Sequence, residues 1–471
     1  MFDNNSIEQQ PWLHKPALVL FLFTSLVFFI RLFLRGSILE IDEAEQIVMA
    51  QHLLPGYPDQ PPLYSWLQYL FFKLLGRNLM SLALLKSILL FGCFYSFHHI
   101  CRLYCQSASL AWCATMSWVF IPAISLDLIK DNTHSVLALF AASVTWYWFV
   151  APSNLAKAVW YAILGFIIGI GFLSKFNYVI FLILLISSAI SLSDYRKKIV
   201  DWHIIITLLL AGLIASPYFL FVIDSPNLAF RSAYKLTSDR NLLLGFIHLI
   251  RACLIFLAPM ILITYLFFPI KKFSSSPSPL HSLLVRYHVL CLLLLISLIF
   301  FSGMGNFATR WLIPILFLGP LLLFRQVKLT DELKPRVRYF LILALSIQLI
   351  FLMLLIQRGH NEHKMQDEFL IREMRHAIST EHHQTEYVVA DSLWLLGNFM
   401  LQLPHHKGWL LHPATYPKLP RGNSLLIWQT SVRPIWIDFF TVMQPEISGI
   451  TQIENPNNHR VIGGYAYSAV K

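Results

Sequence analysis

The sequence predicts a polytopic α-helical membrane protein that ends in a small α/β domain outside the membrane. Of its 471 residues, 56% are hydrophobic and only 13% are charged, whereas a soluble domain carries about 25% charged residues. The mean hydropathy is +0.60. Apolar runs close to the roughly 20 residues that cross a bilayer recur along most of the chain. This composition excludes an ordinary soluble protein.

Eleven apolar runs are predicted to be membrane spans. The first is interpreted as a retained span and not as a removed signal peptide, because Arg35, Gly36 and Ser37 follow it where a small-residue cleavage site would be expected. Residues 1–357 form the predicted transmembrane domain and residues 358–471 the predicted C-terminal domain. The predicted spans are 17–34, 80–100, 108–126, 133–151, 157–173, 177–192, 204–222, 246–268, 287–302, 311–324 and 339–356.

The net charge of +11 is explained by topology. If the N-terminus is cytoplasmic, much of the basic excess falls in the inner loops, as the positive-inside rule requires. The chain is therefore expected to meet anionic lipid and not nucleic acid. The predicted inner loops are 101–107, 152–156, 193–203, 269–286 and 325–338. Isolated cations on the outer side run against the rule and need another explanation: Lys130, Lys175, Arg231, Lys235, Arg240 and Arg310.

The first outer loop holds the most unusual stretch, LEIDEAEQIVMAQHLLPGYPDQPPLYSWLQYLFFKLLG at 39–76. It places carboxylates directly after a membrane span, where desolvation is costly. The pattern from Asp42 predicts a short helix in the membrane interface. Asp42 could cap that helix in a box with Glu45, or it could serve as a general base; spacing alone leaves both open. Prolines then predict a rigid turn, and an aromatic segment that includes Tyr64 predicts a second interfacial helix.

From Arg358 onward the pattern changes to that of a soluble α/β domain on the outer side. A charged helical stretch at 360–377 comes first, and a second helix is predicted at 393–403. The predicted strands are 386–392, 407–413, 424–430 and 459–470.

The sequence gives no strong metal signature. All six cysteines lie in or beside apolar runs, and neither a CxxC pair nor a Cys/His metal spacing occurs, which is typical of small buried hydrophobic residues. No DxD motif is found either. No cofactor is therefore required, although a divalent metal is kept as an alternative.

The stretch IDEAEQIVMAQHLLPGYPDQPPLYSWL resembles the first extracytoplasmic loop of GT-C-fold glycosyltransferases. It is most similar to the bacterial branch of the protein O-mannosyltransferase superfamily, which includes lipid A aminoarabinose transferases and rhizobial lipopolysaccharide-core galacturonosyltransferases. The resemblance continues through KDNTHSVLALF, GFIIGIGFLSKFNYVIFL and NFATRWLIPILFLGPLL. It implies a GT-C fold and transfer of a sugar from a polyprenyl phosphate at the outer face of the inner membrane.

The resemblance also implies roles for individual residues. Asp42 takes the place of the catalytic acidic residue, with Glu43 beside it. Asp131 matches the second acidic position, with Asp127 as a rival and a helix cap as the structural alternative. The expected substrate-binding residues are Gln60, Tyr64, Lys130, Lys175 and Arg310. Lys175 and Arg310 would lie near the lipid phosphate, although both could instead extend to the membrane surface as topological charges.

One departure from the family pattern concerns Gln60. The aminoarabinose transferases carry a lysine before the paired prolines, where this chain has glutamine. Glutamine can donate a hydrogen bond to a phosphate but cannot neutralise it. Another cation is therefore expected to neutralise the donor, and aminoarabinose becomes a weaker candidate for the sugar.

The expected chemistry is an inverting transfer to an envelope acceptor such as lipid A, the lipopolysaccharide core, another glycolipid or a protein. The donor already carries an activated phosphate leaving group, so the enzyme must neutralise that phosphate, deprotonate the acceptor hydroxyl and position both. The alternatives are a transporter or flippase of lipid-linked sugars, a lipid-linked glycan polymerase or ligase, and a non-catalytic scaffold. A transporter would place ionisable residues near the bilayer midplane and repeat its halves, and neither feature is visible.

Overall fold

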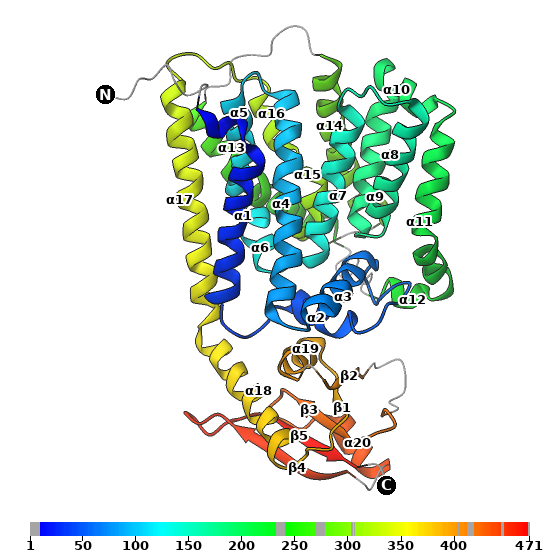
Figure 1. The fold of residues 1–471 in the computed structure, drawn as a ribbon, viewed down its shortest axis with the longest axis vertical. Coiled ribbons are helices and arrows are strands. Elements are labelled where there is room, and N and C mark those ends of the chain that lie inside the picture. The colour runs from blue at the N-terminus through cyan, green and yellow to red at the C-terminus, as the bar shows by residue number, and fades with distance from the viewer. Residues whose placement is uncertain are drawn as a thin grey trace. The chain divides into compact units, whose positions relative to one another are not determined.

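In the computed structural model the chain is mainly helical, with one small sheet near its C-terminus (Figure 1). The residues described are 10–231, 241–268, 278–302, 305, 307–403, 405–411, 419–443 and 447–469. Parts of two predicted loops, 232–240 and 269–277, lie outside them, and so do Lys235 and Arg240. By contacts the chain divides into two units: residues 1–27, 54–64 and 86–352 form the first, and residues 28–53, 65–85 and 353–471 the second.

Each of the eleven predicted spans coincides with a helix or a pair of helices. The elements are α1 (Pro16–Phe33), α4 (Leu79–Tyr104), α5 (Ala108–Met116), η3 (Ser117–Phe120), η4 (Ala123–Asp127), α6 (Leu128–Lys130), α7 (Thr133–Val150), α8 (Lys157–Phe172), α9 (Phe176–Ile190), α10 (Ser193–Val200), α11 (Ile204–Asp224), α12 (Pro226–Ala229), α13 (Leu242–Phe267), α14 (Pro279–Ser302), α15 (Thr309–Leu316), α16 (Gly319–Phe324) and α17 (Lys334–Gly359).

The count of eleven spans is not confirmed. Among the described residues, seven helices are long and apolar enough to cross a membrane, and up to nine if each bent pair is one span. The predicted span 108–126 is bent by 76° where Pro122 follows the short η3 helix. The predicted span 311–324 is divided into α15 and α16, with Pro320 in the first turn of α16. Proline accounts for both breaks because it lacks the N–H that continues a helix.

Small residues and outward-facing leucines suit the first unit to a bilayer. Gly165 and Gly169 let α8 pack closely on α11, since a Cβ on Gly165 would lie 2.8 Å from the carbonyl oxygen of Thr207. Close approach at small residues is how membrane helices associate. On its other side α11 exposes Leu208 and Leu213, as expected of a lipid-facing surface. The helices α7, α8, α9 and α11 lie side by side (Figure 1).

The second unit combines part of the first outer loop with the C-terminal residues. Both interfacial helices predicted in that loop are present, as α2 (Ile41–Met49) and α3 (Leu63–Leu75). The C-terminal part contains α18 (Glu362–Thr380), β1 (Tyr387–Ala390), α19 (Leu393–Gln402), β2 (Lys407–Leu410), β3 (Ser424–Trp428), α20 (Ile435–Met443), β4 (Ile447–Glu454) and β5 (Val461–Ser468). All four predicted strands and both predicted helices are found, whereas α20 and β4 were not predicted.

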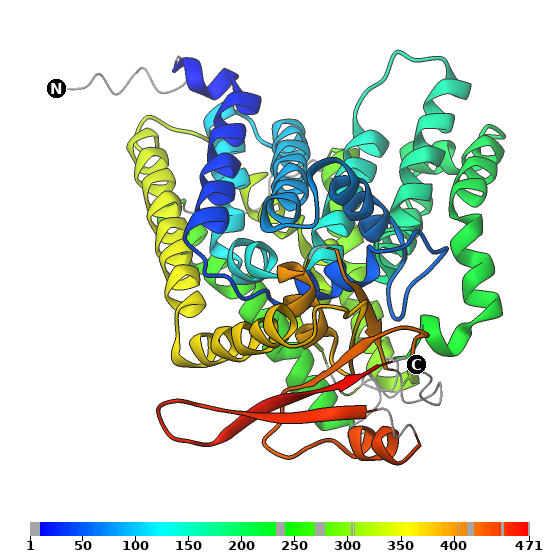
Figure 2. The same cartoon turned by 60° about the horizontal axis from the view of Figure 1, so that its bottom comes forward.

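The sheet has the order β2-β1-β3-β5-β4. β1 pairs in parallel with β2 and β3, and β5 pairs antiparallel with β3 and β4; Figure 2 shows β4 and β5 as a hairpin. Because successive strand residues point to opposite faces, Val388 and Leu425 join one apolar cluster with α18 and α19. Val389 and Leu426 join a second cluster with α20. The domain is therefore a sheet between helices.

Candidate functional site

The acidic stretch after the first span folds as the predicted helix, but Asp42 is not its cap. The chain stays extended through Glu40 (φ −77°, ψ 170°), and α2 begins at Ile41, so Glu40 is the N-cap and Asp42 lies in the first turn. The Glu40 N–H donates to Oε2 of Glu43 at 3.4 Å, closing a box between these two residues. The capping role for Asp42 and Glu45 is therefore wrong by two residues. Asp42 is half-buried and lies where the helix dipole favours a negative charge.

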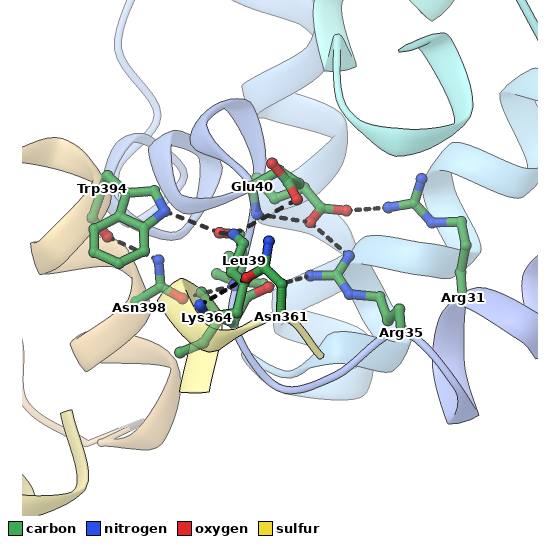
Figure 3. Close-up of polar contacts among 10 residues, drawn as sticks. Arg31, Arg35, Leu39, Glu40, Asn361, Lys364, Trp394 and Asn398 are labelled. Atoms are coloured by element: carbon green, nitrogen blue, oxygen red, sulfur yellow. Dashed lines mark hydrogen bonds and ion pairs between the residues drawn. The ribbon is translucent and has the colours of Figure 1, made fainter. Parts of the chain in front are cut away.

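Glu43 is held from the end of the first span. Its carboxylate is 2% exposed and forms ion pairs with Arg31 and with Arg35, whose Nη1 lies 2.6 Å from Oε2 (Figure 3). Arg31 lies in the last turn of α1, and Arg35 follows two residues after the helix ends at Phe33. A buried carboxylate with both oxygens paired is suited to anchoring α2. The catalytic role predicted for Glu43 stays a prediction.

In the first unit, the proline segment forms the predicted rigid turn. Tyr57 and Gln60 exchange two backbone hydrogen bonds of 3.2 Å. Between them stand Pro58 and Asp59, and Asp59 has a positive φ of 63°, an arrangement typical of a type II turn. The Asp59 N–H donates to the carbonyl of Leu228. Burial raises the pKa of the Tyr57 hydroxyl, opposed by the hydrogen bond that this oxygen accepts from the Leu54 N–H. The turn therefore holds Gln60 at a fixed place, half-buried.

Tyr64 follows the turn and lies in the interior of the same unit. It is 1% exposed, and its ring contacts that of His134 in the first turn of α7, with ring centroids 5.4 Å apart. The preceding residue, Leu63, donates its N–H to the carbonyl of Leu173 at 3.1 Å. The loop is thereby joined to the beginning of α7 and to the turn before α9.

The beginnings of three helices are connected in this unit. Lys175, the N-cap of α9, donates from Nζ to Oγ of Ser135 in the first turn of α7 at 2.8 Å. Asn177 in the first turn of α9 donates to the carbonyl of Trp311 near the start of α15 at 2.7 Å. The helices α7, α9 and α15 also pack on one another. Three N-termini, each the positive end of a helix dipole, are thus linked by side chains.

The other predicted residues of this unit lie near these N-termini. Asp131 stands between α6 and α7, with its N–H bonded to the carbonyl of Asp127 at 2.9 Å. The N-cap of α7 is the next residue, Asn132, with a φ of 58°, so the capping role for Asp131 is wrong. Lys130 ends α6 and is half-buried, and Arg310 lies in the first turn of α15 and is exposed.

Several residues of these arrangements were not predicted from the sequence. Arg31 and Arg35 had a signal, since two arginines one helical turn apart at the end of a span precede a run of carboxylates. Ser135 and Asn177 had none, because small polar residues at a helix start are common. Within the described ranges, no group of three or more His, Cys, Asp or Glu is arranged to hold a metal ion.

The comparisons with known proteins agree with the resemblance seen in the sequence. A family model described as dolichyl-phosphate-mannose-protein mannosyltransferase matches residues 59–221. The chain is 31% identical to the lipopolysaccharide core galacturonosyltransferase RgtB of Rhizobium johnstonii over 292 residues, which cover 60% of this chain and 59% of RgtB. It is 24% identical to RgtA of the same organism over 425 residues, which cover 83% of this chain and 82% of RgtA. The match with RgtB thus spans less than two thirds of that relative.

The fold is shared with a solved structure. ArnT from Cupriavidus metallidurans, in a crystal structure bound to undecaprenyl phosphate, superimposes with a TM-score of 0.66 at 12% sequence identity, covering 95% of this chain and 97% of ArnT. Its apo structure gives a TM-score of 0.62. The predicted GT-C fold with a small C-terminal α/β domain is therefore confirmed, and so is the resemblance to this group of proteins.

Proposed function

We propose that this chain, which has the ArnT fold and resembles lipopolysaccharide core galacturonosyltransferases in sequence, is a membrane glycosyltransferase. It moves a sugar from a polyprenyl phosphate carrier to an envelope acceptor. The names of both curated relatives describe glycosyltransferases, which supports a transferase over a transporter. ArnT, which has the same fold, was crystallised with undecaprenyl phosphate, which supports a polyprenyl phosphate as the sugar carrier. The lipopolysaccharide core and galacturonic acid are accordingly the first acceptor and sugar to test.

The observation that carries this proposal is the linkage of the N-termini of α7, α9 and α15. Helix N-termini present backbone N–H groups and partial positive charge to an anion. Lys175 adds a full positive charge to one of them and is tied to Ser135 on the next. Arg310 adds a second charge at the start of α15. We assign the donor phosphate to this place, where these cations supply the charge that Gln60 lacks.

The other half of the proposed chemistry is removal of a proton from the acceptor hydroxyl. We assign it to Asp42, in the first turn of α2. Its neighbour Glu43 is buried between two guanidinium groups, which suits an anchor better than a base. Direct displacement of the phosphate by the activated hydroxyl inverts the anomeric carbon. Asp131 is kept as a second acidic residue of the site, as the resemblance implies.

The proposal also includes the cellular location of the enzyme. The enzyme would lie in the inner membrane, with the site on the periplasmic side and residues 358–471 as an extracytoplasmic domain. In support, the predicted inner loops contain most of the basic excess, as expected of cytoplasmic loops.

The test is the Asp42→Asn variant. Asparagine keeps the size of the side chain and one acceptor oxygen but cannot accept the proton. Loss of a general base typically lowers the rate by about 10²–10⁴-fold, so we expect an inserted, folded protein with little transfer of sugar from polyprenyl phosphate. Glu45→Gln, the same change one helical turn on, is the matched control and should remain active. An Asp42→Asn protein that keeps more than about a tenth of the wild-type turnover would contradict the assignment.

A further inference from the structure

The C-terminal helix α19 holds the residue that leads into α2. Asn398 accepts a hydrogen bond from the Leu39 N–H at 2.6 Å, and the indole N–H of Trp394 donates to the Leu39 carbonyl at 2.9 Å (Figure 3). Asn398 is 2% exposed and Leu39 is fully buried. The side-chain amide of Asn398 donates in turn to the Trp394 carbonyl at 3.0 Å. Both backbone polar groups of Leu39 are therefore fixed by side chains 355 and 359 residues further along the chain.

The two helices are also in direct contact. Gly397 lies against the backbone of Ala44 so closely that a Cβ at this position would overlap the Ala44 carbonyl. Ala44 and Ile47 belong to the same apolar cluster as Leu396 and Phe399 of α19. The absence of a side chain at Gly397 allows this approach. Thus α2 is packed as part of the core of the C-terminal domain.

Asp42 lies between two anchors. On one side, Leu39 is bound by α19, three residues before Asp42. On the other side, the next residue, Glu43, is bound by the arginines at the end of α1. Catalytic side chains must be held within about 0.5 Å of their working position by surrounding contacts. A backbone anchored on both sides of Asp42 is suited to that requirement.

We propose that α19 is the positioning element for Asp42 and that Asn398 is its key positioning residue. This inference rests on the proposed function, because it assumes that Asp42 acts on the acceptor. It assigns the C-terminal domain a part in the transfer reaction that neither the family match at 59–221 nor the relatives' names describe. The two hydrogen bonds of the Asn398 side chain are both with backbone groups, and Asn398 is not assigned any contact with a substrate.

The experiment compares three variants of the full-length protein. Asn398→Leu removes the acceptor for the Leu39 N–H and keeps the branched shape of the side chain. Asn398→Asp keeps an acceptor oxygen and is the conservative rescue. Ile437→Val is the matched control, since Ile437 is fully buried in the apolar cluster on the opposite face of the sheet. Two quantities are measured: hydrogen–deuterium exchange of peptides covering residues 37–50, and turnover against donor concentration.

Leaving a buried N–H without an acceptor should increase exchange in Asn398→Leu by about tenfold or more. Turnover at saturating donor should fall by about tenfold or more, while the KM for the donor stays within about twofold. Asn398→Asp should recover part of both, because it keeps the acceptor for the Leu39 N–H but loses the donor to the Trp394 carbonyl. Ile437→Val should lower the melting temperature without changing either quantity. If Asn398→Leu does not fold, Trp394→Phe removes the shorter of two hydrogen bonds to the Leu39 carbonyl, which also accepts from Lys364 at 3.5 Å. This variant keeps a ring and is judged by the same criteria.

Three results would overturn the proposal: faster exchange with unchanged turnover, unchanged exchange in Asn398→Leu, or an equal loss of turnover in Ile437→Val. A purely structural role of Asn398 predicts the last of these. A wild-type protein that transfers no sugar would instead contradict the proposed function. The exchange measurement would then still decide whether Asn398 holds α2.

Discussion

At the scale of single residues, Lys175 is a cation that the predicted topology places on the outer side, and its contact gives it a local role. A lysine on the outer side of a membrane protein runs against the positive-inside bias. Here its ammonium donates to Ser135 of α7 at 2.8 Å, so the charge at the start of α9 is tied to a neighbouring helix of the first unit. A fixed ammonium at a helix N-terminus is suited to a phosphate.

We therefore predict that Lys175→Met raises the KM for the polyprenyl phosphate donor by about tenfold or more, because a charge-assisted contact to a phosphate typically contributes about 1.5–3 kcal/mol. Lys175→Arg should lose less, since it keeps the charge. The measurement is transfer rate against donor concentration in detergent. An unchanged donor KM in both Lys175→Met and Arg310→Met would contradict the assignment of the donor phosphate to these two residues.

A second residue-scale prediction concerns Asp367 on α18. Desolvation by burial raises the pKa of its carboxyl, opposed by the nearby charge of Lys364 and by the hydrogen bond from Gln429 at 2.7 Å. Because the pKa of Asp367 is raised in the folded state, its contribution to stability is fully present below the unfolded pKa of about 4. That contribution to stability is lost as the pH rises through the folded pKa.

Asp367→Asn should therefore stabilise the protein at pH 7 and reduce the fall in melting temperature between mildly acidic and neutral pH. The comparison variant is Asp331→Asn, where the exposed carboxyl has its pKa lowered by the hydrogen bond and charge of Lys334; it should give no gain at pH 7. Thermal melts at several pH values check both. A neutral-pH melting temperature that falls in Asp367→Asn would contradict the prediction.

At the scale of elements, glycine decides how closely α2 and α19 approach. A methyl group at Gly397 would overlap the backbone of Ala44, and backbone cannot give way as the end of a flexible side chain can. Helix propensity alone would favour alanine over glycine by about 1 kcal/mol. The sign of the effect is therefore set by the contact and not by the helix.

Gly397→Ala is expected to destabilise the second unit by about 1–3 kcal/mol, the usual cost of overpacking. Gly212→Ala on α11 is the control, because a Cβ there meets nothing within 4 Å; it should be neutral or slightly stabilising. Denaturation of both variants in the same detergent checks the difference. If Gly397→Ala and Gly212→Ala are equally stable, α2 and α19 can move apart without loss of stability, and the prediction is wrong.

At the scale of the whole molecule, the distribution of charge predicts the topology. Arg336 and Arg338 stand at the beginning of α17 and Arg358 at its end; α17 is the last of the described helices that is long and apolar enough to cross a membrane. If the N-terminus is cytoplasmic, α17 carries the chain outward, and residues 358–471 follow on the outer side. The division by contacts assigns residues from 353 onward to the second unit, together with 28–53 and 65–85; the predicted domain boundary at 357 stays a prediction.

Reporters fused after Arg338 and after Arg358 should therefore report opposite sides of the membrane. A phosphatase reporter, active only outside the cytoplasm, and a fluorescent reporter, active only inside it, give complementary signals. Matching signals at the two positions would refute the assignment of α17 as the last span.

The sequence by itself determined the parts of this protein that depend on short stretches. Apolar length predicted runs that all fold as helices, although proline broke the predicted spans 108–126 and 311–324 and the count of eleven spans is not confirmed. Short apolar runs identified four strands of the sheet. β4 was missed because it contains Gly449, which weakens the pattern of a strand. α20 was missed because nine mostly apolar residues do not show a clear helical period.

Only the tertiary structure decided what surrounds the acidic residues. The sequence placed Asp42 and Glu43 side by side but could not show that Glu43 is buried between Arg31 and Arg35. Nor could it show that Leu39 is bound by Trp394 and Asn398. Periodicity reports contacts over a few residues, whereas the hydrogen bonds to Leu39 join segments more than 350 residues apart along the chain. Such contacts form only when helices and sheet pack, so they depend on the fold as a whole.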